Sequence, residues 1–323
     1  MTVFVTGGSG IVGRSLVTRL VAEGSPVRAL ARSAEAAGDI RSLGAEPIMG
    51  DLSNVPALLS GMRGTGAVFH VAGLNAMCLA DPTPLYRTNV DGTRNVLRAA
   101  NAAEVPRLVY TSSAVVLGER QGEVGRETSP HRGFPLSHYE RSKTLAEEVA
   151  FAEAGAVEVV AVNPSSVQGP GRATGTGKLI LDVLNGDLSV MTNSNLSIVD
   201  IDDCTEGHLR AWRGGAGGER YVLSGFTMST RAAISMLERV TGRKLSIRFV
   251  PAVAASVGAS AASAYARMRR SRPRVCGEMV RVLLHGHTYD GSRATSELGL
   301  EYRKPEDTIR RTVEWFQSEG ILR

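Results

Sequence analysis

Three side chains that can take part in proton transfer stand out by their types and spacing. Tyr139 and Lys143 lie four residues apart in the stretch YERSK, and Ser113 comes earlier, in YTSSA. On a helix, residues at i and i+4 share one face. A nearby ammonium favours the phenolate and lowers the pKa of a tyrosine, and a serine hydroxyl alongside can hold a substrate oxygen. The pair alone is common in helices, so its chemistry depends on the surrounding elements.

A glycine-rich turn near the start of the chain provides that context. The run TGGSGIVG follows a strand-like stretch and opens a helix, with Gly7, Gly10 and Gly13 three residues apart. This spacing allows a tight turn, a close approach of the backbone to a diphosphate and close helix–strand packing. The first helical amides, among them those of Ile11 and Val12, then face the phosphates. Together with the tyrosine, lysine and serine, a bound dinucleotide predicts hydride transfer coupled to proton transfer.

The ends of the next two strands indicate which dinucleotide binds. An acid usually holds the adenosine ribose about 20 residues after the glycine turn, but the second strand ends without one. Arg32 there suits a 2′-phosphate, so we expect NADP(H) in preference to NAD(H). NAD(H) binding and a plain surface role for Arg32 stay open. Asp51, followed by Leu52, is expected either to accept a hydrogen bond from the adenine or to cap the helix near Ser53.

These residues require a framework of alternating strands and helices. Strands are expected at 2–6, 27–31, 46–49, 67–71, 107–111 and 157–162, and helices at 11–23, 86–103 and 137–153. The alternation predicts an α/β fold with a Rossmann-type, doubly wound parallel sheet. After Pro164 the rhythm breaks. We expect a dinucleotide-binding domain over 1–165 with a returning segment near 196–212, and a smaller substrate-binding α/β portion over 166–323.

Composition limits the classes of partner. No apolar run reaches the ~20 residues of a membrane span, and Met1 runs straight into a strand, so we expect no signal peptide and a cytoplasmic protein. Cys78, Cys204 and Cys276 match no metal spacing, and their odd number favours reduced thiols; we expect no metal. Five arginines between 267 and 274 form either a solvated face or an anion-binding surface. No aromatic residue interleaves with them, so nucleic acid is not an expected partner.

With these motifs in place, the chain resembles the extended short-chain dehydrogenase/reductase family along nearly its whole length. The resemblance implies that Tyr139 is the acid/base, with Ser113 beside it, and that Lys143 also binds the nicotinamide ribose. A family asparagine matches Asn89 in NVDGT, which adds it to the catalytic set. The family's fourth-strand end and its loop after strand six add further cofactor contacts, at Val71, Ala72, Gly73, Pro164 and Ser166.

One position helps to choose between the branches of this family. Similar sugar-nucleotide epimerases carry an arginine that binds the substrate diphosphate where Leu196 stands here. The nearer resemblance is to the dihydroflavonol-reductase-like and 3β-hydroxysteroid-dehydrogenase-like branch, which includes bacterial hopanoid-associated sugar epimerase-like proteins. We therefore expect an NAD(P)(H)-dependent oxidoreductase acting on a carbonyl or secondary alcohol. A sugar or nucleotide-sugar epimerase is the alternative.

The expected substrate wall comprises 74–79, 116–117, 165–177 and the Ala-rich stretch near 252–266. It is mostly apolar or small, so we expect a small apolar ketone or alcohol, although each segment equally fits ordinary core. His70 and His138 are expected to be structural. Family members often dimerise through a four-helix contact that includes the tyrosine helix, so the resemblance implies a possible homodimer.

Overall fold

The computed structural model describes residues 1–258 and 276–323, and its centre is a seven-stranded sheet in which every neighbouring pair is parallel. The strand order is β10-β6-β5-β4-β1-β2-β3. The strands are β1 (Val3–Thr6), β2 (Val27–Ala31), β3 (Glu46–Met49), β4 (Ala67–His70), β5 (Arg107–Thr111), β6 (Glu158–Pro164) and β10 (Arg220–Leu223). The order reverses beside β1, which is where open α/β sheets bind their ligands. The predicted Rossmann-type sheet is confirmed.

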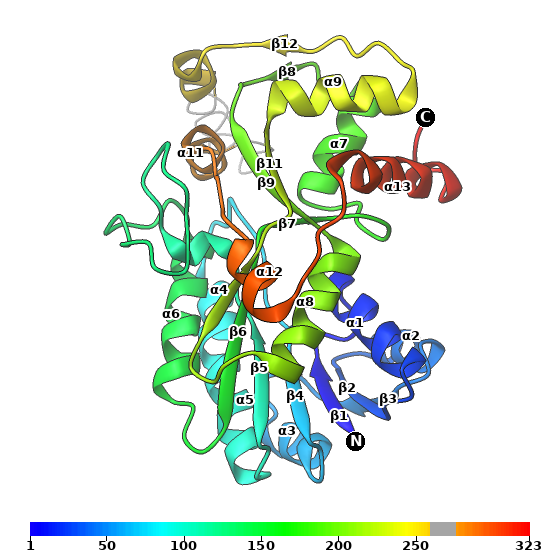
Figure 1. The fold of residues 1–323 in the computed structure, drawn as a ribbon, viewed down its shortest axis with the longest axis vertical. Helices are drawn as coiled ribbons and strands as arrows, with labels where there is room; N and C mark the ends of the chain where they lie inside the picture. Colours follow the sequence, from blue (N-terminus) through cyan, green and yellow to red (C-terminus); the bar gives the residue numbers. More distant parts are fainter. Residues whose placement is uncertain (259–275) are drawn as a thin grey trace.

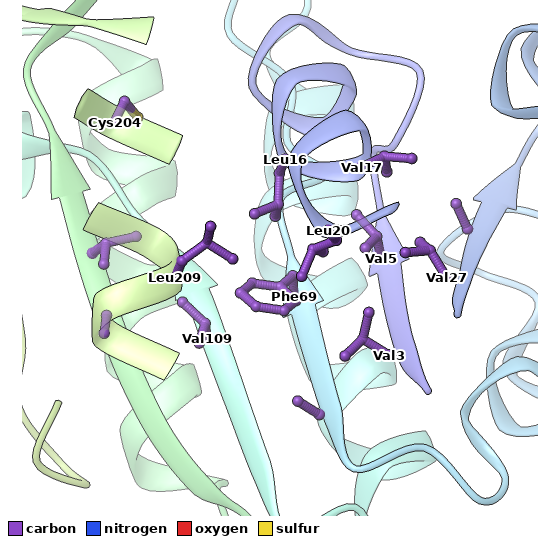
Figure 2. Packing of buried hydrophobic residues seen from close by; sticks show 14 of the residues in the cluster. Val3, Val5, Leu16, Val17, Leu20, Val27, Phe69, Val109, Cys204 and Leu209 are labelled. Atoms are coloured by element: carbon purple, nitrogen blue, oxygen red, sulfur yellow. The ribbon is translucent and has the colours of Figure 1, made fainter. Parts of the chain in front are cut away.

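Alternate residues of the strands pack into two separate cores, one on each face of the sheet. Val3 and Val5 belong to one core, and Phe4 between them belongs to the other. In the first core, Leu20 and Leu209 bring two helices together over the sheet (Figure 2). The helices on that face are α1 (Ile11–Ala22), α2 (Ala34–Ser42), α8 (Ile201–Gly214) and α12 (Ser292–Leu298). The opposite face carries α3 (Val55–Met62), α5 (Gly92–Ala102) and α6 (His138–Ala152). Burial on both faces explains why the strands read as nearly continuous apolar runs.

A smaller α/β portion lies beyond the carboxyl ends of the strands, in the upper half of Figure 1. Its sheets contain β7 (Ser166–Gln168), β9 (Asn195–Asp200) and β11 (Phe226–Ser229), and the pair β8 (Val190–Met191) and β12 (Arg248–Phe249). Its helices are α7 (Thr176–Leu184), α9 (Thr230–Thr241), α11 (Gly277–His285) and α13 (Pro305–Ser318). Between β9 and β11 the chain returns to the large sheet as α8 and β10.

The helix expected over 86–103 is not one continuous α-helix. A short α4 (Thr83–Tyr86) is followed by a π-helical turn (Arg87–Asp91), and only then does α5 begin. Asn89 lies in this turn, buried and hydrogen-bonded to Leu74 and Ser142. Single π turns often occur at functional sites. Here the wider turn accompanies an inward-facing amide that apolar periodicity does not reveal.

The expectation that all three cysteines are reduced is wrong. Cys78 and Cys276 form a disulfide across a sequence separation of 198 residues, with their Cα atoms 5.8 Å apart. Cys204 is free and buried. The pairing depends on a contact between the loop after β4 and the start of α11, which no local spacing discloses.

The arginine cluster at 267–274 lies outside the described residues. Among the helices that are described, none combines the length and apolarity needed to cross a bilayer.

Candidate active site

The glycine turn is packed so closely that side chains are excluded. Gly7 has a φ of +74°, and a Cβ atom there would lie 2.7 Å from the backbone nitrogen of Ala72. A Cβ atom on Gly13 would collide with the carbonyl oxygen of Gly7. Gly10 is the N-cap of α1 and provides no side-chain cap, so the amides of the first helical turn have no side-chain partner there. A cradle of this kind fits a diphosphate at a helix N-terminus.

Arg32 lies directly after β2, exposed at the surface. Ser33, the next residue, caps α2 by accepting a hydrogen bond from the amide of Ala36, 3.2 Å away. Within 1–258 and 276–323, no hydrogen bond or ion pair engages the Arg32 guanidinium. A free guanidinium at the end of the second strand fits a 2′-phosphate, since arginine binds phosphate through two parallel hydrogen bonds.

Asp51 accepts hydrogen bonds from the amide and hydroxyl of Ser53, at 2.8 and 2.6 Å, which lower the pKa of its carboxyl. The N-cap of α3 is Asn54, so Asp51 is not the cap of this helix, as one alternative for Asp51 supposed. Leu52 is half-buried, and its carbonyl accepts a hydrogen bond from Asn95 at 2.9 Å. Both predicted residues therefore lie in one turn after β3.

The end of β4 is fixed by a fully buried histidine. The two ring nitrogens of His70 lie 2.7 Å from the hydroxyl of Thr6 and 3.0 Å from that of Thr93. Burial, with a smaller contribution from the charge of Lys143, lowers the pKa of His70 to about 3, so the ring is neutral at physiological pH. The Thr6 hydroxyl also accepts a hydrogen bond from the amide of Ala72, at 3.2 Å. His70 thus positions Val71, Ala72 and Gly73, the predicted cofactor-binding stretch.

Lys143 is held by β5 at the floor of the site. Its ammonium donates to the Tyr110 hydroxyl and to the Thr111 carbonyl, both at 2.9 Å. Burial lowers the pKa of Lys143 to about 8, while the charge of Glu147 acts in the opposite direction. A Cβ atom on Gly73 would lie 3.8 Å from the ammonium, so the glycine leaves the amine accessible from the cofactor-binding loop.

Tyr139 is half-buried and lies one turn before Lys143 on α6. Burial raises the pKa of its phenol, and a hydrogen bond with Ser113 and the charge of Arg172 act in the opposite direction. The expectation that Lys143 lowers this pKa is not met, because its ammonium is directed at β5. The structure brings Ser113 and Tyr139 together from two elements that are far apart in the sequence.

Asn89 links these parts. Its side-chain oxygen accepts from the Leu74 amide at 2.7 Å, and its amide donates to the Leu74 carbonyl at 3.0 Å and to the Ser142 hydroxyl at 2.8 Å. The loop after β4 is therefore fastened to the helix that carries Tyr139 and Lys143. Asn89 acts on the site as a positioning group as well as a candidate contact.

The loop after β6 closes the opposite side. Pro164 ends β6, and the Ser166 hydroxyl donates to Thr176 at 2.9 Å, which joins β7 to the start of α7. Leu117, in the expected substrate wall, instead packs with Ala114, Val222 and Tyr289 in a small buried core. His138 takes no part in the contact between Ser113 and Tyr139. Its Nδ1 atom lies 3.0 Å from the Tyr86 hydroxyl.

Two functional groups could not be singled out from the sequence. Tyr110 is a strand residue that looks like core, yet it holds the Lys143 ammonium. Arg172 lies in the glycine-rich loop before α7, where its charge acts on the phenol of Tyr139. Its Nε atom is buried and has no hydrogen-bond partner in the described structure. The one signal that could have indicated Arg172 is its position as a single basic residue in a stretch of small residues.

Comparisons with known proteins agree with this geometry. A protein of Synechocystis named "Putative dihydroflavonol 4-reductase" is 34% identical over 99% of this chain and 96% of its own length. A 4-hydroxy-2-methyl-3-oxo-4-farnesyl-3,4-dihydroquinoline-1-oxide ketoreductase of Stigmatella aurantiaca is 32% identical, over 94% and 92% of the two chains. The crystal structure of gox2253 superposes with a TM-score of 0.86 at 31% identity, covering 100% of this chain and 99% of the other. Residues 3–224 match the model of the NAD dependent epimerase/dehydratase family. The protein is therefore an enzyme of the NAD dependent epimerase/dehydratase family.

Proposed function

We propose that the protein is an NADP(H)-dependent oxidoreductase that interconverts a carbonyl and a secondary alcohol in a small molecule. The observation that carries this proposal is the half-buried pair of Ser113 and Tyr139, with Lys143 one turn further on, beside the turn that cradles the cofactor. The nicotinamide, when bound, supplies or takes up the hydride. The side chains of this protein provide the proton and the orientation.

The phenol of Tyr139 suits the role of proton donor in the direction of reduction. Burial raises its pKa, so at neutral pH the phenol holds its proton until a substrate oxygen accepts it. Ser113 lies close enough to donate a hydrogen bond to the same oxygen. In the direction of oxidation the phenol must first lose its proton, which the charge of Arg172 favours. We infer that reduction is the easier direction near neutral pH.

Lys143 orients the cofactor in this proposal. Its ammonium is anchored on β5 and lies next to Gly73, so a ribose in that loop would meet a fixed hydrogen-bond donor. Arg32 binds the 2′-phosphate and gives the preference for NADP(H). We further predict that the substrate is a small apolar ketone or alcohol. We also predict a homodimer with the tyrosine helix at its interface.

A nucleotide-sugar epimerase is the second candidate, and one observation favours it. Arg172 is a half-buried cation whose charge acts on the phenol of Tyr139, and among the described residues no carboxylate forms an ion pair with it. Such a group suits an anionic substrate. Against this candidate, Leu196 stands on β9, so that strand offers no arginine at the position the epimerases use.

Net consumption of the reduced cofactor separates the two functions. Purified protein would be mixed with NADPH and a panel of ketones, aldehydes and nucleotide-sugars, and the absorbance of the reduced nicotinamide would be followed. Steady oxidation of NADPH by a carbonyl substrate is the expected result. Retained cofactor, no net oxidation and isomerised sugar at the end of the reaction would refute the oxidoreductase proposal and support the epimerase.

A further inference from the structure

A glutamate and two histidines meet at the seam between the dinucleotide-binding part and the C-terminal part. Glu119 follows the 3₁₀ turn (Ala114–Leu117) that comes directly after Ser113. His285 ends α11, and His287 lies two residues beyond it. Glu119 and His287 are 168 residues apart in the sequence, so only the folded chain brings these side chains together.

The atoms that can bind a metal ion are close to one another. One ligand atom from each of the three residues lies within 4.8 Å of the other two. The Glu119 Oε1 atom lies 2.6 Å from Nδ1 of His287 and 3.5 Å from Nε2 of His285. The two imidazole rings have their centroids 5.1 Å apart. Ligand atoms about 2.1 Å from one tetrahedral ion lie about 3.4 Å from each other, so an ion would replace the hydrogen bond between Glu119 and His287 with only a small movement of the side chains.

The cluster also has unused bonding capacity. Glu119 is 1% exposed, and its Oε2 atom is buried without a hydrogen-bond partner. The Nε2 atoms of His285 and His287 are likewise buried and unpartnered across the described parts of the chain. Buried polar atoms in native structures are nearly always satisfied, so three such atoms from one cluster call for a partner.

We propose that Glu119, His285 and His287 bind one divalent transition-metal ion, of which Zn²⁺ is the best fit. Two imidazoles and one carboxylate suit Zn²⁺ and its neighbours in the series, whereas Mg²⁺ and Ca²⁺ require sets of oxygen ligands. The Tyr289 hydroxyl lies 2.9 Å from Nδ1 of His287 and offers a further oxygen at the site. We name this set the Glu119 cluster.

Neighbouring charges are compatible with a tightly bound ion. Arg132 lies nearby, but it forms an ion pair with Glu140 and donates from Nη1 to the Glu119 carbonyl at 3.2 Å. Its charge is thereby offset, and it fixes the backbone of a ligand. His285 lines a cavity of about 500 Å³ together with Arg120, Arg132 and Arg281, which provides a path for entry. Those arginines repel any cation, so the bonds to the ligands have to outweigh this repulsion.

The ion would stabilise the contact between the segment after α11 and the residues that follow Ser113. Around the cluster, the Gly125 amide donates to the Thr288 carbonyl at 2.8 Å, and the Asp290 amide donates to the Gly125 carbonyl at 3.0 Å. An ion at the Glu119 cluster would close the same seam with stronger bonds. It would therefore hold the segment after α11 onto the residues between Ser113 and the tyrosine helix.

Direct titration tests the proposal. Chelator-treated protein would be titrated with Co²⁺, whose visible absorption reports its coordination, and then with Zn²⁺ in competition with a chromophoric chelator. We expect one ion per chain and a Zn²⁺ dissociation constant of about 0.1 µM or tighter. We also expect a higher melting temperature with Zn²⁺ at about 100 times that constant. Wild-type protein that binds neither ion at this strength overturns the proposal without any variant.

Variants locate the ion. Glu119→Gln keeps the size of the side chain and removes its charge, and His287→Gln removes one imidazole. Loss of a residue that only hydrogen-bonds to a metal ligand weakens metal binding by about 10- to 100-fold. Each of these two variants should weaken Zn²⁺ binding by more than that. The control is His131→Gln, which removes a nearby imidazole outside the set and should bind as wild type does. Folding of each variant would be checked by circular dichroism in chelator. Unchanged binding in both folded ligand variants would show that the ion is held elsewhere and would also overturn the proposal.

Discussion

Lys143 donates a hydrogen bond to the phenolic oxygen of Tyr110, 2.9 Å away, and its ammonium lies 4.6 Å from the centre of that ring. The lysine is therefore positioned by a strand of the central sheet and not by the tyrosine one turn before it. Tyr110 itself is fully buried, and burial raises its pKa well above the usual value, so it stays protonated. The ammonium has a fixed place before any ligand binds.

The first prediction concerns the proton donor. Tyr139→Phe removes only a hydroxyl, so the fold and the affinity for NADPH should be retained while turnover falls by about 10²–10⁴. Single-turnover rates and cofactor titration would separate the two effects. As a control, Tyr302→Phe removes a hydroxyl that bonds the backbone of Val222 and Gly291, and its turnover should be nearly normal. Near-normal turnover in Tyr139→Phe would rule out the proposed acid/base.

The second prediction follows from the lowered pKa of Lys143. In the folded protein this pKa is about 8, against 10.5 for the free side chain. Between these values the unfolded chain holds a proton that the folded chain has released, so this group's contribution to stability rises with pH. Cofactor binding should change in the opposite direction, because the neutral amine is a weaker donor to the ribose.

Isothermal titration across that pH range would measure the effect. The dissociation constant for NADPH should increase as pH rises through about 8 in the wild type. Lys143→Met should bind more weakly at neutral pH and lose this dependence. A pH profile that is the same in both proteins would exclude Lys143 as its source.

The third prediction concerns cofactor choice. Arg32→Ala should weaken NADPH binding by about 10- to 100-fold, the size of a charged hydrogen bond to phosphate, and leave NADH binding unchanged. Arg32→Asp should move the preference toward NADH. Arg41→Ala, an exposed arginine on α2, is the matched control. A wild-type preference for NADH, or equal losses for both cofactors in Arg32→Ala, would contradict the assignment.

The fourth prediction concerns the disulfide. Cys78 and Cys276 close a loop of 198 residues, so reduction should lower the free energy of unfolding by about 2–5 kcal/mol. Denaturant unfolding with and without a reductant would measure this difference. The double variant Cys78→Ser/Cys276→Ser serves as the control, because the reductant should then have no effect. Equal stability of oxidised and reduced wild type would show that the bond adds nothing to the fold.

Local patterns predicted most of the sheet. The residues of β2, β3 and β5 lie where the sequence predicts them. The runs of β2 and β5 are mostly buried, whereas β3 is an edge strand with no buried residue and is recognised from the turn residues that bound it. By contrast, β10 was not predicted, since its four residues follow a long excursion and only the contact with β6 makes them a strand. The π turn before α5 was also not predicted, because apolar periodicity continues through it.

Within the site, residue types were easier to predict than their partners. The glycine turn and Tyr139 depend on local spacing. The partners of Lys143 and the pairing of Cys78 depend on contacts between distant segments. Glu278 illustrates the difficulty, since it accepts from the amide of Cys78 at 2.9 Å and from that of His138 at 2.6 Å. One carboxylate late in the chain thereby connects the disulfide to the first turn of the tyrosine helix.

The late arrival of β10 matters for how the chain folds during synthesis. When the ribosome has completed β6 but not residues 220–223, the sheet ends in a strand whose outer hydrogen-bonding edge is open and whose side chains are apolar. Open edges of this kind pair with other chains and lead to aggregation. During synthesis this edge is therefore open to wrong pairing until the residues up to 223, about 60 beyond the end of β6, have emerged.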